Sequence, residues 1–141
     1  MSEDRGPSTD EERLQVGAGR TILLVEDNLH NRRIFTSILT HYGFAVREAV
    51  NGAEAVELAR SLRPALILMD LSLPVLDGWE ATRRIKDDAE LRAIPIIALT
   101  AHAMSGDEGR ALDAGCDAYL SKPISPKKVV SAVQEMLAKR P

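Results

Sequence analysis

Five polar residues stand directly after short apolar segments, at positions where the strands of a sheet would end. They are Glu26 and Asp27 after residues 21–25, Asp70 after residues 65–69, Thr100 after residues 96–99, and Lys122 after residues 117–121. In an open parallel sheet, ligands bind outside the carboxyl ends of the strands, where the strand order reverses. The pattern therefore predicts that these five side chains form one site.

The three acids of this set indicate a metal ion. Carboxylates that converge in one cleft repel one another, and a hard divalent cation relieves that repulsion. Mg²⁺ suits such a site because it binds one or two carboxylates together with waters and phosphate oxygens. The alternative is that Glu26, Asp27 and Asp70 are solvated or cap the following helices, which explains one acid better than three at matching strand ends.

The threonine and the lysine favour phosphoryl chemistry at the same place. A carboxylate can attack phosphorus and form an aspartyl-phosphate. A lysine ammonium then neutralises charge on the transferring group, and a hydroxyl donates a hydrogen bond to one of its oxygens. Taken alone, Thr100 is typical of a sheet-end turn and Lys122 of a solvated surface; their places beside the strand of Asp70 favour the functional interpretation.

Length and composition indicate one ordinary globular domain. The 141 residues are 45% hydrophobic and 28% charged, and a net charge of −3 argues against a nucleic-acid surface. No apolar run approaches the ~20 residues that cross a bilayer. The N-terminus is polar and unlike a secretory signal, and one cysteine cannot form an internal disulfide. These features predict a cytoplasmic protein without membrane insertion.

From residue 21 onward, short apolar segments alternate with amphipathic helical segments. Strands are predicted at residues 21–25, 44–48, 65–70, 94–99 and 117–121. Helix caps are predicted at Asn51, Asp77, Ser105 and Ser125, and Gly43 is predicted to end the first helix. Five strand–helix units with short connections predict an α/β fold, a doubly wound parallel sheet with helices on both faces. Residues 1–20 lack apolar periodicity and are predicted to form a flexible tail.

Four blocks of the chain resemble the signature motifs of bacterial response-regulator receiver domains. The blocks are LLVEDN at 23–28, LMDLSLP at 68–74, ALTA at 98–101 and YLSKP at 119–123. In this order and at this spacing they are most similar to stand-alone, CheY-like or DivK-like receivers. The resemblance implies a flavodoxin-like (βα)5 fold with strand order 2-1-3-4-5. It also implies a receiver domain over residues 21–139, following the tail 1–20.

The resemblance assigns roles to the polar set. Asp70 would be the phosphoacceptor, which takes a phosphoryl group from a phosphohistidine, and Lys122 would contact that group. Asp27 and Asp70 would bind Mg²⁺, Glu26 would act mainly through metal-bound water, and the backbone carbonyl of Ser72 would be a further ligand.

The resemblance also assigns switch and lifetime positions. Thr100 would move toward the phosphoryl group and Tyr119 would swing inward, although a half-buried aromatic at a strand edge is an alternative for Tyr119. Ser72 and His102 depart from the chemotaxis-type pattern at positions that tune phosphoryl lifetime in this family. For His102, an imidazole in a surface loop is the competing interpretation.

The predicted function is a phosphorylation-controlled binding switch rather than a turnover enzyme. Its partners would be a histidine kinase or a histidine phosphotransfer protein, and a downstream protein. The downstream protein would bind the face formed by the helix after Ser105, the strand 117–121 and the helix after Ser125. The output is open between a phosphorelay shuttle and an allosteric effector, and a DNA-binding output is not expected because no effector domain is expected after Lys139.

Three other functions share parts of this pattern. A phosphohydrolase of the haloacid-dehalogenase type also uses an aspartate nucleophile with Mg²⁺, but its second aspartate is replaced here by Ser72. A flavin or nucleotide binder lacks support because the chain has no G-x-x-x-x-G-K-[ST] loop. A pseudo-receiver that signals by binding alone, without phosphorylation, is the third alternative.

Overall fold

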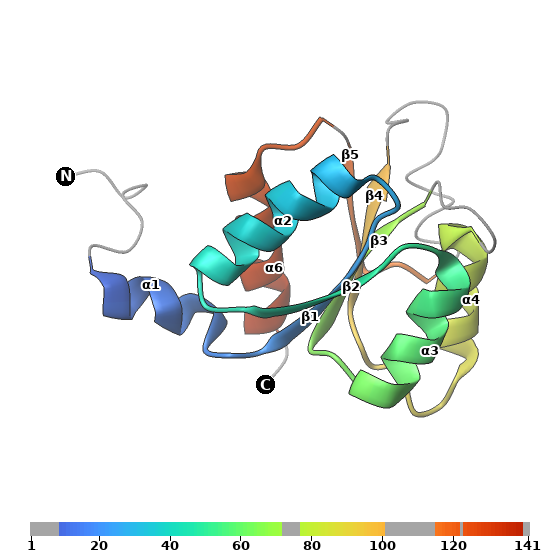
Figure 1. Ribbon diagram of the computed structural model, residues 1–141. Coiled ribbons are helices and arrows are strands. Elements are labelled where there is room, and N and C mark those ends of the chain that lie inside the picture. Colours follow the sequence, from blue (N-terminus) through green and yellow to red (C-terminus); the bar gives the residue numbers. More distant parts are fainter. Residues whose placement is uncertain (1–8, 72–76, 101–114, 122, 140–141) are drawn as a thin grey trace.

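The computed structural model describes residues 9–71, 77–100, 115–121 and 123–139 (Figure 1). Its sheet is entirely parallel, with strand order β2-β1-β3-β4-β5. The strands are β1 (Thr21–Val25), β2 (Ala45–Ala49), β3 (Leu66–Asp70), β4 (Ile96–Thr100) and β5 (Ala118–Ser121). The described helices are α1 (Asp10–Gly17), α2 (Leu29–His41), α3 (Gly52–Leu62), α4 (Gly78–Asp87) and α6 (Pro126–Ala138). The strand order confirms the predicted doubly wound fold; the helix expected after Ser105 lies outside the described residues.

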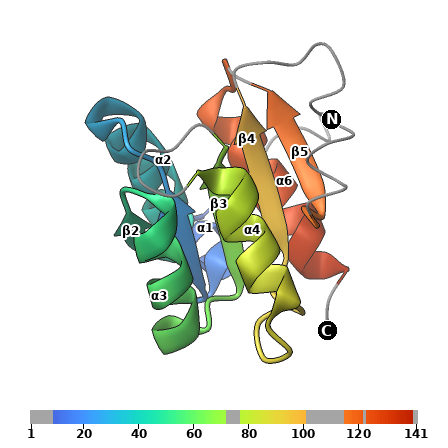
Figure 2. The same ribbon diagram turned by 90° about the vertical axis from the view of Figure 1, so that its right-hand side faces the viewer.

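Two hydrophobic cores form because successive side chains of the central strands point to opposite faces of the sheet. On one face, strand residues such as Leu24 and Leu68 pack with α2 and α6. On the other face, residues such as Val25 and Met69 pack with α3 and α4, which lie side by side in Figure 2. Every residue of β3 and β4 is buried, whereas β2 is mostly exposed at the sheet edge, where the predicted strand order places it.

The helix boundaries follow from the capping residues. Asn51, Asp77 and Ser125 each accept a hydrogen bond from the backbone N–H three residues later, which confirms three predicted N-caps. Gly43 has φ +88°, and its N–H donates to the carbonyl of Thr40 at 3.0 Å while the next N–H donates to that of Leu39 at 3.1 Å. Gly43 therefore ends α2 in a Schellman motif, as predicted.

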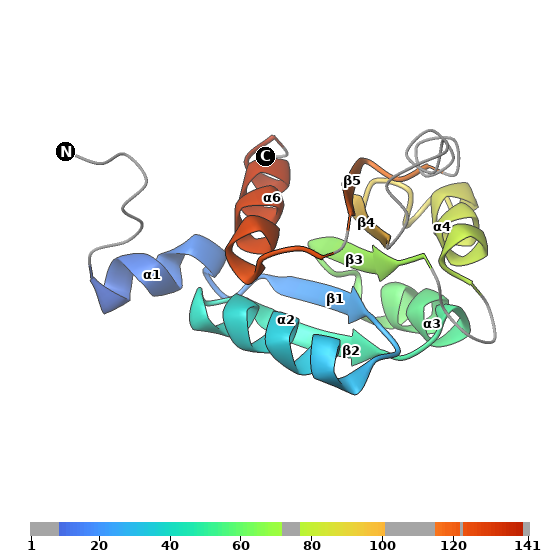
Figure 3. The same ribbon diagram turned by 90° about the horizontal axis from the view of Figure 1, so that it is seen from above.

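Helix α1 corrects the prediction of a flexible tail for residues 10–17. Thr9 caps it by accepting a hydrogen bond from the N–H of Glu12 at 3.0 Å. The helix lies at the end of α2 that is remote from the carboxyl ends of the strands (Figures 1 and 3). There the N–H of Gly17 donates to the carbonyl of Tyr42 at 2.7 Å. A Cβ on Gly17 would lie 2.4 Å from the carbonyl carbon of Gly43. This contact is between backbones, so the sequence shows no apolar stripe that would have revealed the helix.

Within the described residues, none of the helices combines the length and the apolar composition that a bilayer span requires.

Candidate functional site

The strand register brings the predicted acids to one edge of the sheet. Val25 at the end of β1 is paired with Met69 of β3, so Glu26 and Asp70 continue side by side beyond that pair. Asp70 is paired with Leu99 of β4, and Thr100 ends β4 one residue further along. The strand order reverses at β1 and β3, which is where ligands bind in open parallel sheets.

The acidic site consists of the carboxylates of Glu26, Asp27 and Asp70. One carboxylate oxygen from each residue lies within 4.8 Å of those from the other two. Glu26 and Asp70 are 0% and 4% exposed, whereas Asp27 faces solvent. Three hard oxygen donors, two of them buried, fit a small divalent cation such as Mg²⁺ and would repel one another without one. The structure thus brings together the three acids that the sequence singled out.

The remaining predicted residues divide between described and undescribed parts of the chain. Thr100 is 2% exposed and is paired with Ser121, the residue before Lys122. Tyr119 is half-buried against the core beside α3 and α4. Three predicted site residues lie outside the described residues: Ser72, His102 and Lys122.

Two residues on the first turn of α2 contact the acidic site and were not predicted. Asn31 Nδ2 donates a hydrogen bond to Glu26 Oε1 at 3.0 Å. Arg32 Nη1 donates to the backbone carbonyls of Glu26 and Asp27, at 3.0 and 2.9 Å. Both residues lie in the first turn of a helix that starts two residues after the acids. The first turn of such a helix lies over the end of the strand, so the sequence does indicate that these two side chains are near the acidic site.

A glycine at the start of α4 was also missed. A Cβ on Gly78 would lie 2.3 Å from the carbonyl oxygen of Asp70 and 2.6 Å from Leu71 Cα. The N–H of Gly78 donates to the carbonyl of Leu71 at 3.3 Å. The absence of a side chain therefore lets the N-terminus of α4 lie directly against the backbone that carries Asp70.

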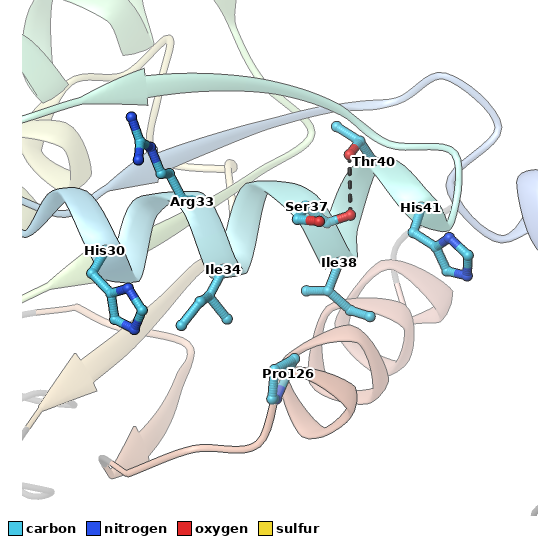
Figure 4. A pocket seen from close by; sticks show the side chains of 8 residues that line it. All are labelled: His30, Arg33, Ile34, Ser37, Ile38, Thr40, His41 and Pro126. Atoms are coloured by element: carbon cyan, nitrogen blue, oxygen red, sulfur yellow. Dashed lines mark hydrogen bonds between the residues drawn. The ribbon is translucent and has the colours of Figure 1, made fainter.

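A groove of about 720 Å³ runs along the exposed side of α2 (Figure 4). Ile34 and Ile38 point toward Pro126 at the start of α6, while His30 and His41 mark the two ends of the groove. Arg33, Ser37 and Thr40 complete its lining. The groove thus has an apolar floor with basic and hydroxyl groups around it, and its His30 end is close to the acidic site.

At the opposite end of the sheet, oppositely charged groups meet. Lys86 Nζ donates to Asp117 Oδ2 at 2.9 Å and to the backbone carbonyls of Arg92 and Ile94 at 3.0 and 2.8 Å. The N–H of Ile96, at the start of β4, donates to the same Asp117 oxygen at 2.8 Å. This Lys86–Asp117 cluster joins α4 to the first residues of β4 and β5.

Cys116 is buried beside that cluster. It is 5% exposed, and burial raises the pKa of its thiol to about 11. Its Sγ lies 3.9 Å from Thr82 Oγ1, and a hydrogen bond from that hydroxyl to the sulfur would lower the pKa, but the effect of burial is larger. A protonated, buried thiol is unsuited to nucleophilic chemistry.

Comparison with known proteins agrees with this geometry. The family model for the response regulator receiver domain matches residues 22–134. The chain belongs to the family of response regulator receiver domains. The polar-differentiation response regulator DivK of Brucella anthropi is 46% identical over 118 residues, which are 84% of this chain and 96% of that protein. The receiver family is thus established by both the family match and this identity, and the predicted relation to DivK-like regulators is confirmed.

Solved receiver structures are similar over the same region. The receiver domain of the sensor histidine kinase PA1611 from Pseudomonas aeruginosa has a TM-score of 0.80 and 42% identity. The match covers 86% of this chain and 99% of that one, and that structure holds a magnesium ion in its active-site cleft. The chemotaxis response regulator CheY4 of Vibrio cholerae has a TM-score of 0.79 and 25% identity, covering 83% and 98% of the two chains. This receiver domain therefore serves two-component signalling, and a phosphohydrolase is not favoured.

Proposed function

We propose that Asp70 is the phosphoacceptor of this receiver domain. In the transfer, a carboxylate oxygen of Asp70 forms a bond to phosphorus as the bond from phosphorus to the donor's imidazole nitrogen breaks, and the electron pair stays on that nitrogen. The single observation that carries the proposal is the convergence of Glu26, Asp27 and Asp70 within 4.8 Å at the point where the strand order reverses.

The acidic site would bind Mg²⁺ through Asp27 and Asp70, with Glu26 acting mainly through metal-bound water. The backbone carbonyl of Ser72 is the further proposed ligand. When bound, Mg²⁺ would neutralise the carboxylates and polarise phosphoryl oxygens, so that an anionic donor can approach an anionic acceptor. The donor set supports this ion, and so does the magnesium ion held by the related PA1611 receiver domain.

The other predicted residues would respond to the phosphoryl group. Lys122 would pair with its charge, and the hydroxyl of Thr100 would donate a hydrogen bond to one of its oxygens. Tyr119 would then move inward, and Ser72 and His102 would set how fast water removes the phosphoryl group. Transfer and slow autodephosphorylation would both be catalysed by the domain itself, which makes it a switch rather than a turnover enzyme.

The downstream partner would be a protein that binds the face including β5 and α6. Phosphorylation would shift a pre-existing equilibrium between two forms of that face. The proposed setting is the cytoplasm, as a single-domain regulator that acts either as a phosphorelay shuttle or as an allosteric effector. Direct DNA binding is not part of the proposal.

The phosphohistidine donor would dock on the groove along α2. The groove begins near the acidic site at His30 and offers an apolar floor at Ile34 and Ile38 with Arg33 beside it. A helix of the donor carrying apolar and acidic side chains would complement it. Ile38→Asp should therefore slow phosphotransfer from a histidine kinase at least tenfold, but leave phosphorylation by acetyl phosphate unchanged. Equal rates of kinase transfer in the variant and the wild type would refute this docking site.

The proposal for Asp70 is tested by intact mass spectrometry after incubation with acetyl phosphate and Mg²⁺. The wild type should gain one phosphoryl group, and omission of Mg²⁺ should prevent the gain. Asp70→Asn should gain none, while the matched control Asp10→Asn, on exposed α1, should behave as the wild type. A folded wild-type protein that gains no phosphoryl group, from acetyl phosphate or from a histidine kinase, would instead support a pseudo-receiver that signals by binding alone.

A further inference from the structure

We propose that Asn31 and Arg32 are positioning residues for the acidic site. They would hold the Glu26–Asp27 turn so that both carboxylates face Asp70, without being metal ligands themselves. The inference rests on the proposed Mg²⁺ binding. It is carried by three hydrogen bonds from the first turn of α2, two from Arg32 to backbone carbonyls and one from Asn31 to a carboxylate oxygen.

Arg32 is suited to hold the turn because one nitrogen serves both acids. Its Nη1 lies 3.0 Å from the carbonyl oxygen of Glu26 and 2.9 Å from that of Asp27. Two consecutive carbonyls that share one donor must point the same way, which restricts the peptide unit between them. The side chains attached to that peptide unit are thereby restricted in direction as well.

The guanidinium is itself held from the opposite side. Arg32 Nε lies 3.4 Å from Glu48 Oε1, and Thr36 Oγ1 donates to Glu48 Oε2 at 2.7 Å. The Arg32 side chain is only 14% exposed. The planar guanidinium thus bridges the edge strand β2 and the acidic turn with different nitrogens, which a lysine ammonium cannot reproduce in the same geometry.

Asn31 acts on the carboxylate rather than on the backbone. Its Nδ2 donates to Glu26 Oε1 at 3.0 Å, and Glu26 is fully buried. A hydrogen bond to one carboxylate oxygen fixes the rotation of the group and so determines how the carboxylate faces the cleft. Groups of this kind around metal sites are worth a factor of about 10 to 100 in metal affinity.

A positioning role and a simple charge effect of Arg32 predict opposite results. As a cation beside the site, Arg32 repels Mg²⁺, so its neutralisation alone would tighten metal binding. If Arg32 positions the acids, its neutralisation weakens metal binding, because the carboxylates lose their common direction. The sign of the change in Mg²⁺ affinity therefore separates the two.

The experiment is isothermal titration of Mg²⁺ into the full chain without any phosphodonor. Arg32→Met should raise the Kd about tenfold, Arg32→Lys should raise it less, and Asn31→Ala should raise it several-fold. Arg63→Gln is the matched control, because Arg63 pairs with Glu90 at an exposed position, and its Kd should equal that of the wild type. Melting temperatures without Mg²⁺ establish that each variant is folded.

An Arg32→Met protein that binds Mg²⁺ as tightly as the wild type, or more tightly, overturns the inference. Asn31→Ala alters no charge and places a good helix former in α2, so it is expected to fold. It therefore tests the positioning role even if Arg32→Met does not fold. Wild-type affinity in Asn31→Ala overturns the inference equally. Both outcomes leave the proposed function intact, whereas a wild-type protein that binds no Mg²⁺ contradicts the proposed function as well.

Discussion

The two ends of the parallel sheet arrange their charged side chains in opposite ways. At the carboxyl end, the like charges of Glu26, Asp27 and Asp70 converge within 4.8 Å. At the amino end, Lys86 and Asp117 meet at 2.9 Å and also bind backbone groups. The amino end is completed by the protein's own charges, whereas the carboxyl end is suited to a cation from solution. Charge thus joins elements of the fold at the amino end, and in the proposed function it binds a ligand at the carboxyl end.

The largest effect is expected from Lys86→Met, which breaks the amino-end cluster. It would leave the carboxylate of Asp117 and the carbonyls of Arg92 and Ile94 without the ammonium. We expect a loss of about 2 kcal/mol in the free energy of unfolding, less than for a fully buried pair because both side chains are partly exposed. Urea unfolding measures it, with Arg63→Gln of the exposed Arg63–Glu90 pair as control. If Lys86→Met loses no more stability than Arg63→Gln, the Lys86–Asp117 cluster does not stabilise the fold as proposed.

The next effect is the gain in stability from Mg²⁺ at the carboxyl end. A ligand that binds only the folded state at ten times its Kd adds about 1.4 kcal/mol to the free energy of unfolding. Urea unfolding of the wild type with and without Mg²⁺ should show this gain, and Lys86→Met should show the same gain from its lower baseline. Equal stability with and without the ion would mean that the acidic site binds no Mg²⁺.

A smaller effect of opposite sign to Lys86→Met is expected from Asp70→Asn without Mg²⁺. Removing one of three converging like charges should raise the free energy of unfolding by about 1 kcal/mol. The same variant should gain little from added Mg²⁺. Thermal unfolding in a chelating buffer gives the comparison, and destabilisation by Asp70→Asn would show that the three acids do not strain the fold.

The smallest effect concerns the buried thiol at the amino end. The pKa of Cys116 is raised from 9.0 to about 11, so the folded state keeps its proton where the unfolded state loses it. The stabilisation is complete below pH 9 and decreases as pH rises through the folded value. Between pH 7.5 and 9.5 the wild type should lose under about 1 kcal/mol more stability than Cys116→Ala. If the free energies of unfolding of the wild type and Cys116→Ala change equally with pH, the pKa of Cys116 is not raised in the folded state.

The fold could be predicted from the sequence because its signals are local. Apolar segments of strand length, each followed by a capped helix, indicate a doubly wound sheet, and Asn51 and Asp77 cap where expected. Helix α1 could not be predicted in this way. Its closest contact is between the backbones of Gly17 and Gly43, and Val16 is the apolar side chain that it packs against the core, so the helix shows no apolar stripe.

The acids of the site could be predicted, whereas the sequence indicates only the place of Asn31 and Arg32 in the next helix and not the hydrogen bonds that they donate to the acidic turn. Glu26, Asp27 and Asp70 follow strands, and parallel strands bring their carboxyl ends together whatever the details of packing. Asn31 and Arg32 act through hydrogen bonds whose partners depend on the angle at which α2 leaves the strand. That angle is set by tertiary packing. The roles of Lys122, Ser72 and His102 remain predictions.

The contact between α1 and the receiver fold depends on two absent methyl groups. A Cβ on Gly43 would lie 2.0 Å from the carbonyl oxygen of Leu14, and one on Gly17 would lie 2.4 Å from the backbone of Gly43. An alanine at Gly17 would push α1 away from the end of α2, whereas an alanine at Gly43 would also strain the left-handed residue that ends α2. In evolutionary terms, one nucleotide change in the codon of Gly17 would be enough to disturb the packing of α1 against the end of α2.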